Sequence, residues 1–214
     1  MASKEQKEKW KKIGLVAPLF VFYSFGSALS GIVGRVLFVE HVGAQYLPHT
    51  YVVGALLGSV LTVATSRLMK RMSLANLLQI FSWGGAAFFF ANYLWMETAS
   101  TWAYSTFLIT SSFFYLILAG TVIWRIVGNL CSLFEFKGTF LYYSLAYCLG
   151  GVLAGLSSNL LEASLGLKQL ILFICMSLVL AALNLAWIQR SYDKKLQPNF
   201  EEKDQNSTWL AVRS

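Results

Sequence analysis

One charged side chain lies well inside an apolar stretch of this sequence. Arg35 follows an uncharged run that begins at position 13, and it precedes the end of that run near Val39 by four residues. A charge at this depth in a bilayer is costly unless it is paired or hydrated, so it is a candidate for function. One interpretation is a substrate or anion contact in a central cavity. The other is that the long side chain extends to the outer headgroups.

Two polar residues complete the candidate substrate contacts. Asn129 lies in the segment after Arg125, and Ser111 belongs to a group of hydroxyl residues at helical spacing. Such hydroxyls can line a pathway, or they can bond to their own helix and pack against a neighbour. The other members of this group are Ser105, Thr106, Thr110 and Ser112.

Charged residues also mark two connections between apolar segments. The connection after the second apolar segment carries Arg67, Lys70 and Arg71, and the connection after the fourth carries Glu135 and Lys137. We treat these five residues as candidates for a gating loop. The alternative is that both connections are solvated turns.

Residue types that support catalysis are scarce. The histidines, His41 and His49, lie in one short connection, and the three cysteines have no paired spacing. The sequence has no phosphate-binding glycine loop, metal-ligand cluster or nucleophile motif. We therefore expect no enzymatic activity, no metal and no cofactor.

These residues must be positioned by membrane helices. Of the 214 residues, 57% are hydrophobic and 13% are charged, whereas soluble domains are about a quarter charged. A spanning helix needs roughly 20 apolar residues, and isolated strands cannot satisfy their backbone in lipid. The sequence predicts an all-α integral membrane protein with six spans. They are 13–39, 49–69, 75–96, 102–124, 139–161 and 168–189.

Lys and Arg alternate between the two sides of these spans. They are concentrated in the arm 1–12, in the second and fourth connections, and in the tail 190–214. The positive-inside rule therefore places both termini in the cytoplasm, with the chain in a bacterial inner (plasma) membrane or an equivalent organellar membrane. The net charge of +7 follows from this bias and from contact with the lipid bilayer, so we expect no nucleic-acid partner.

The two halves of the sequence resemble each other at an offset of 92 to 94 residues. The stretch 32–34 (IVG) recurs at 126–128, and 57–61 (LGSVL) is similar to 149–153 (LGGVL). Three helices are an odd number, so the second copy must be inverted in the membrane, as in secondary transporters. We expect repeats at 13–96 and 102–189 within one domain, 13–189.

Glycines four residues apart occur in the second predicted helix of each repeat. Gly54 and Gly58 form one pair, and Gly151 and Gly155 form the other. Small residues at this spacing let helix backbones approach closely. We expect all four to pack helices together.

Motifs in both halves resemble a known family. The stretch 39–48 (VEHVGAQYLP) with the basic turn 66–71 (SRLMKR), and the segment from Trp124 to Asn129 followed by 135–137 (EFK), are similar to the ATP/ADP translocase family and its major-facilitator-like bacterial relatives. The likeness covers roughly residues 20–160. It implies the N-terminal half of a major facilitator fold and a nucleotide or organic anion as substrate.

The sequence departs from that family in three respects. The family has about twelve helices, whereas six are expected here. Lys70 takes the place of an acidic residue that the resemblance implies helps to close the gate. Arg35 is the one basic residue expected inside the bundle, whereas the family's nucleotide carriers hold more.

Two functions remain open from the sequence. The chain could be half of a carrier that acts as a homodimer or with a second membrane subunit, with Arg35 as the substrate anchor. Alternatively, it could be a non-transporting structural or accessory subunit of a larger membrane complex. A partner is expected in both cases.

Overall fold

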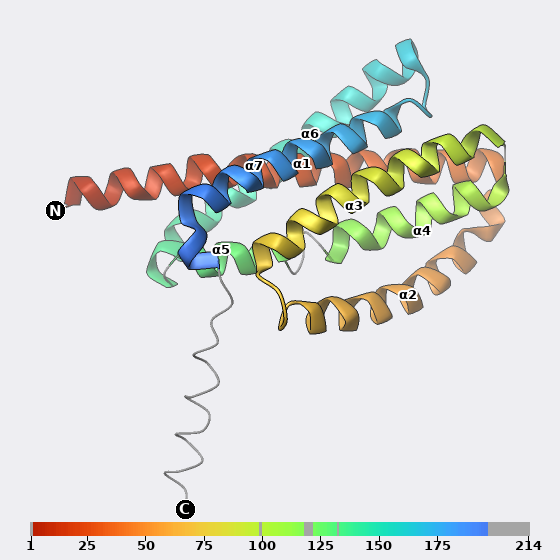
Figure 1. Cartoon of the computed structure of the whole chain (residues 1–214). Helices are drawn as coiled ribbons and strands as arrows, with labels where there is room; N and C mark the ends of the chain where they lie inside the picture. The colour runs from red at the N-terminus through yellow and green to blue at the C-terminus, as the bar shows by residue number, and fades with distance from the viewer. Residues whose placement is uncertain (1, 99, 118–121, 132, 197–214) are drawn as a thin grey trace, which may run out of the picture.

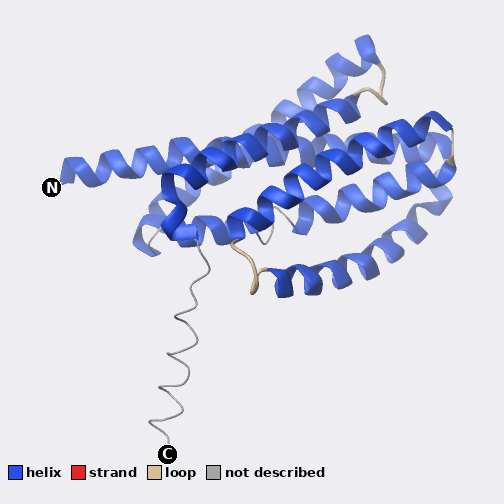
Figure 2. Ribbon diagram, in the orientation of Figure 1, coloured by secondary structure: helices blue, strands red, loops and turns tan. Residues whose placement is uncertain are grey.

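The computed structural model describes residues 2–98, 100–117, 122–131 and 133–196, and these residues are helical except for short connections. Figure 1 shows the helices as one elongated bundle, and Figure 2 shows the loops as short segments at the helix ends. The elements are α1 (Ala2–His41), η1 (Ala44–Tyr46), α2 (Leu47–Leu68), α3 (Leu74–Trp95), η2 (Met96–Thr98), α4 (Thr101–Ile117), α5 (Trp124–Leu130), α6 (Leu133–Leu165) and α7 (Leu170–Leu196).

Local sequence signals set several helix ends. Pro48 lies in the first turn of α2, where its missing N–H breaks no helical bond. The hydroxyl of Ser73 caps α3 by accepting a hydrogen bond from the backbone N–H of Asn76 at 3.2 Å. Gly43 and Gly166 have φ of +108° and +89° in the turns after α1 and α6, a conformation that favours glycine.

Helix α1 is much longer than a membrane crossing requires. Its 40 residues span about 60 Å, roughly twice the hydrocarbon thickness. Residues 2–12 of the predicted basic arm are therefore the first part of the same helix. Trp10 in this part packs edge-on against Tyr142 of α6, with ring centroids 5.3 Å apart. The predicted tail begins inside α7, and its residues 197–214 lie outside the described residues.

The helices form two layers. Helix α1 contacts α4, α6 and α7, and α2 packs on α4, so one layer has the order α2, α4, α1, α6. The second layer consists of α3 and α7, which contact each other and lie on α4 and α1 (Figure 1). No described element covers the other side of the four-helix layer, which we call the open face.

Aromatic side chains fill the space between the layers. The buried ring of Phe89 lies 5.7 Å from Phe107, 5.5 Å from Phe114 and 6.1 Å from Tyr115, measured between centroids. Phe20 is also buried and stacks on Tyr143 of α6. The centre of the bundle is therefore a packed core.

Large apolar side chains cover much of the outer surface. On α2, Leu56 and Val60 are 67% and 66% exposed, and on α6, Leu156 and Leu160 are 62% and 75% exposed. Exposed apolar area on this scale is unfavourable in water. Five described helices are long and apolar enough to cross a membrane, so the fold is compatible with membrane insertion.

The described residues contain five candidate membrane spans, one fewer than the six expected from the sequence. The five candidate spans are Glu8–His41, Ala44–Leu68, Leu74–Thr98, Phe136–Leu165 and Leu170–Tyr192. The predicted span 102–124 is described as α4, with 17 residues, and α5, separated by residues that the structure does not describe. Seventeen residues lie at the lower limit for a crossing. The backbone before α5 also has a wider, π-type turn at 122–123.

Candidate functional site

Arg35 lies on the open face near one end of the bundle. Its neighbours Val33 and Leu37 are buried, whereas Arg35, Val36 and Val39 are exposed. One turn earlier, a Cβ added to Gly31 would meet no atom within 4 Å. This side of α1 is therefore uncovered by any described helix, and the guanidinium is accessible to a ligand or a partner.

The structure does not bring Arg35, Asn129 and Ser111 together. Asn129 is exposed on α5, at the end of the bundle where the N-terminus lies, whereas Arg35 precedes the opposite end of α1 (Figure 1). Ser111 is buried, and its hydroxyl donates to the carbonyl of Leu108 at 3.1 Å. In this chain the three predicted substrate contacts do not form one cavity.

The basic connection between α2 and α3 forms an exposed cluster. Arg67 lies in the last turn of α2, and Lys70 and Arg71 follow before α3 begins. Arg125 of α5 joins them, because its Nη1 donates to the sulfur of Met69 at 3.6 Å. No described acidic side chain pairs with these four cations, which we call the basic turn.

The other two gating candidates lie at the start of α6. Lys137 is exposed, and the side chain of Glu135 lies outside the described residues. Lys137 stands next to Gly138, and a Cβ on that glycine would lie 2.9 Å from Nζ of Lys9. The start of α6 is therefore close to the N-terminal part of α1.

The four predicted packing glycines differ in their surroundings. A Cβ at Gly54 or Gly58 would overlap the ring of Phe113 on α4. A Cβ added to Gly151 would lie 3.6 Å from Oγ of Ser24 on α1, an ordinary contact, and a Cβ on Gly155 would have no neighbour within 4 Å.

Gly150, which the spacing rule did not select, has less space for a side chain than the other described glycines of α6. A Cβ there would overlap the backbone carbonyl of Val21 on α1. Gly58 occupies the corresponding position in the repeat, so the repeat could have identified Gly150 as a helix-packing residue.

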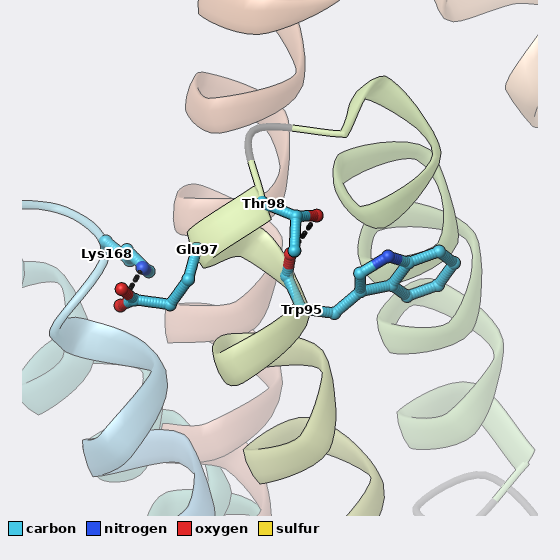
Figure 3. Close-up of polar contacts among 4 residues, drawn as sticks. All are labelled: Trp95, Glu97, Thr98 and Lys168. Carbon is cyan, nitrogen blue, oxygen red and sulfur yellow. Dashed lines mark hydrogen bonds and ion pairs between the residues drawn. The ribbon is translucent and has the colours of Figure 1, made fainter.

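An ion pair joins two connections at the end opposite the termini. Nζ of Lys168, before α7, donates to Oε1 of Glu97 at 2.6 Å (Figure 3). The same ammonium lies 4.9 Å from the ring centroid of Tyr93. At the other end of the same two helices, the side-chain amide of Gln189 on α7 donates to Oδ1 of Asn76 on α3 at 3.1 Å.

Buried polar groups lie between the two layers. The hydroxyls of Tyr23 on α1 and Ser82 on α3 are hydrogen-bonded. Near them, a Cβ on Gly26 would lie 2.5 Å from both the hydroxyl of Tyr115 on α4 and Oγ of Ser177 on α7. The bond between Tyr23 and Ser82 joins α1 to α3, and all four of these polar residues are buried inside an aromatic core.

Two hollows lie beside α2. The first, about 560 Å³, lies at the end where α1 meets α2 and α4, and its wall includes His49, Thr50 and Ser105. The second, about 340 Å³, is nearly all apolar and lies between α2 and α3 with α4 as its floor. We call the second one the apolar groove. This groove was not predicted from the sequence, although the adjacent glycines Gly84 and Gly85 in its wall are a signal that could have identified it.

Comparisons with known proteins give no match. No family model, curated protein or solved structure matches the chain. The resemblance to ATP/ADP translocases stays a prediction from the motifs.

Proposed function

We propose that the chain is a six-span membrane protein built from two inverted three-helix halves, and that it serves as one half of a transporter-like assembly. The halves are α1 to α3, and α4 to α7 with α5 continuing the fourth span. The observation that carries the proposal is that contacts in one half have counterparts in the other, shifted by about 92 positions.

The polar pairs between α3 and α7 support the inverted arrangement most directly. Glu97 pairs with Lys168 at one end, and Asn76 pairs with Gln189 at the other. Gln189 stands 92 positions after Glu97, and Lys168 stands 92 positions after Asn76. When one half is the inverted copy of the other, each polar pair has a counterpart, and the two pairs lie at opposite ends of the same two helices.

Helix packing follows the same correspondence. Helix α6 lies on α1, and α2, its counterpart, lies on α4, the counterpart of α1. In both contacts a glycine of the second helix faces the partner, Gly150 in one and Gly58 in the other, 92 positions apart. Tyr23 and Tyr115 occupy matching buried positions on α1 and α4 at the same offset.

The open face favours an assembly of two halves. It presents Arg35 at a depth where a lone charge is unfavourable in lipid, and no described acid pairs with it. A second copy, or another membrane subunit, on this face would enclose Arg35 in a shared cavity. The resemblance implies that an organic anion or a nucleotide would bind there.

Uptake into proteoliposomes tests the transport function. The purified chain would be reconstituted and supplied with labelled ATP and with labelled organic anions. We expect uptake that Arg35→Leu abolishes and Arg35→Lys partly retains, with Arg190→Gln as the control that removes a cation elsewhere. Uptake by Arg35→Leu equal to that of the original chain would exclude Arg35 as the anchor.

The packed core favours a second candidate function, that of a structural subunit. Phe89, Phe107 and Tyr115 fill the centre of the described bundle and leave no polar path within a single chain. A subunit of this kind would copurify in mild detergent with different membrane proteins, identified by mass spectrometry, and would show no uptake. A two-fold dimer with disulfide crosslinks between Val39→Cys side chains would instead favour the carrier.

A further inference from the structure

We infer that the apolar groove and the basic turn together form a binding site for one anionic phospholipid, with an acyl chain in the groove and the phosphate at the turn. This inference requires α2 and α3 to lie in a bilayer and is independent of transport.

The groove has the lining of an acyl-chain site. Leu61 of α2, Ile80 and Phe88 of α3, and Phe114 of α4 contribute to its wall, and its polar residues are Thr65 and Thr110. Both threonines carry a methyl group, and a threonine hydroxyl in a helix can bond to a carbonyl of its own helix. Water has few hydrogen-bond partners in such a space, whereas an apolar chain is stabilised there because its surface is removed from water.

The groove opens sideways, toward the position of lipid. Leu61, Ile80 and Phe88 at its rim are each 40% exposed or more. Helix α2 packs on α4 and has no extensive contact with α3, so a chain can enter between α2 and α3 without separating a packed helix pair. At Gly84 a Cβ would meet no atom within 4 Å, whereas a Cβ at Gly85 would overlap the ring of Phe114, so the open part of this wall is at Gly84.

The basic turn lies at the distance from the groove that a phospholipid requires. Thr65 in the groove is two residues from Arg67, and Ile80 is seven residues from Ser73. These separations correspond to about 3 and 10 Å along a helix. The headgroup layer of a bilayer is about 5–8 Å thick, so a phosphate near Arg67 places its acyl chains beside the groove.

The charge at the turn is complementary to a phosphate. Arg67, Lys70, Arg71 and Arg125 are exposed, and no described acidic group neutralises them. The turn also precedes the N-terminus of α3, a helix of 22 residues, whose free N–H groups favour an anion. A neutral or zwitterionic headgroup would gain less from this cluster.

Native mass spectrometry of the full chain in mild detergent tests the inference. Phosphatidylglycerol and phosphatidylcholine would be titrated separately, and retained lipid measured. We expect one phosphatidylglycerol to bind at least about tenfold more tightly than phosphatidylcholine, since each cation near a headgroup contributes to anionic preference.

Two sets of variants separate the charge from the groove. The triple variant Arg67→Gln, Lys70→Gln, Arg71→Gln should weaken phosphatidylglycerol binding about 100-fold, and Lys9→Gln, Lys11→Gln, Arg190→Gln removes the same charge as its control. Gly84→Leu should fill the groove and weaken binding about tenfold, with Gly84→Ala as a milder form. Gly155→Leu is the control, because its side chain also enters open space.

Three results would overturn the inference. Equal binding of the two lipids would show that the charge has no role. Binding unaffected by Gly84→Leu and by Gly84→Ala, but abolished by glycerol phosphate as a competitor, would indicate an anion site without an acyl chain. Equal losses in the control variants would show a general effect of charge or of added bulk.

Discussion

Helices α2 and α6 occupy corresponding places in the two halves, yet they are held in different ways. Helix α6 lies on the backbone of α1, where Gly150 faces the carbonyl of Val21. On α2, Gly54 and Gly58 face a side chain of α4, the ring of Phe113. In the apolar windows of these spans, 28% of α6 residues and 11% of α2 residues are buried.

The difference shows when a glycine contact can determine the position of one helix on another. A backbone partner cannot move away without displacing its whole helix, so Gly150 determines the position of α6 on α1. A ring partner can turn about its side-chain bonds, so α2 can shift when Phe113 changes rotamer. We therefore expect the α1–α6 contact to be the rigid part of the fold and α2 to be the mobile one.

The largest expected effect comes from breaking the rigid contact. Gly150→Leu would force a side chain into the backbone of α1, and we expect a loss of about 3 kcal/mol in stability. Thermal unfolding of the purified protein in detergent would measure it. Gly155→Leu, whose side chain meets open space, should leave the melting temperature nearly unchanged, and an equal loss in both variants would contradict the comparison.

A smaller effect is expected at the contact between α2 and α4. Gly58→Ala should cost about 1–2 kcal/mol, because the ring of Phe113 can move to make room. Combining it with Phe113→Leu should recover part of that loss, which a double-mutant cycle would measure as a coupling energy. Additive losses would indicate that the ring does not restrain α2.

Hydrogen exchange would compare the mobility of the two helices without a substitution. Amides of α2 at 54–65 should exchange faster than those of α6 at 143–154, because fewer contacts oppose local opening of α2. Mass spectrometry of peptides from the two helices in detergent would measure the ratio. Equal protection of the two helices would remove the proposed difference in rigidity.

The smallest effect is expected at the ends of α3 and α7. Glu97→Gln should cost only about 0.2–1 kcal/mol, because the carboxylate is 63% exposed and the pair is screened by solvent. Asn76→Ala, which removes the corresponding bond at the other end, should have a similarly small effect. A loss above about 2 kcal/mol at either position would mean that these pairs, rather than the glycines, hold the layers together.

The sequence was most informative where helix ends have local causes. The expected spans 49–69 and 75–96 differ by at most two residues from α2 (Leu47–Leu68) and α3 (Leu74–Trp95). Pro48 and Ser73 are recognisable start signals, and long apolar runs predict spanning helices. The length of α1 could not be predicted in this way, because its charged first part is stabilised by contacts such as that of Trp10 with Tyr142.

Contacts between helices were harder to predict than the helices themselves. Spacing selected Gly151 and Gly155, whereas Gly150 faces α1. Gly151 and Gly155 lie on one face of α6, whereas Gly150 points in a different direction, and only the neighbouring helix determines which position is covered.

The candidate site illustrates the same limit. Arg35 was selected as a charge inside an apolar run and Asn129 as a polar residue of the segment after Arg125, but the two lie near opposite ends of the bundle. Under the proposed inversion, matching positions must lie at opposite depths. Asn129 stands 94 positions after Arg35, within the offset of the proposed repeat, which explains why the two residues do not meet.

The central place of α1 has a consequence for the order in which the protein is made. Helix α1 leaves the ribosome before the other described helices, and two of its three main packing partners, α6 and α7, begin only at Leu133 and Leu170. At about 5–20 residues per second, α1 waits several seconds beside the insertion machinery with only α4 for support. Assembly of the four-helix layer is therefore a late event, and ribosomes stalled before α6 would hold an intermediate in which Val21 and Ser24 of α1 have not yet met Gly150.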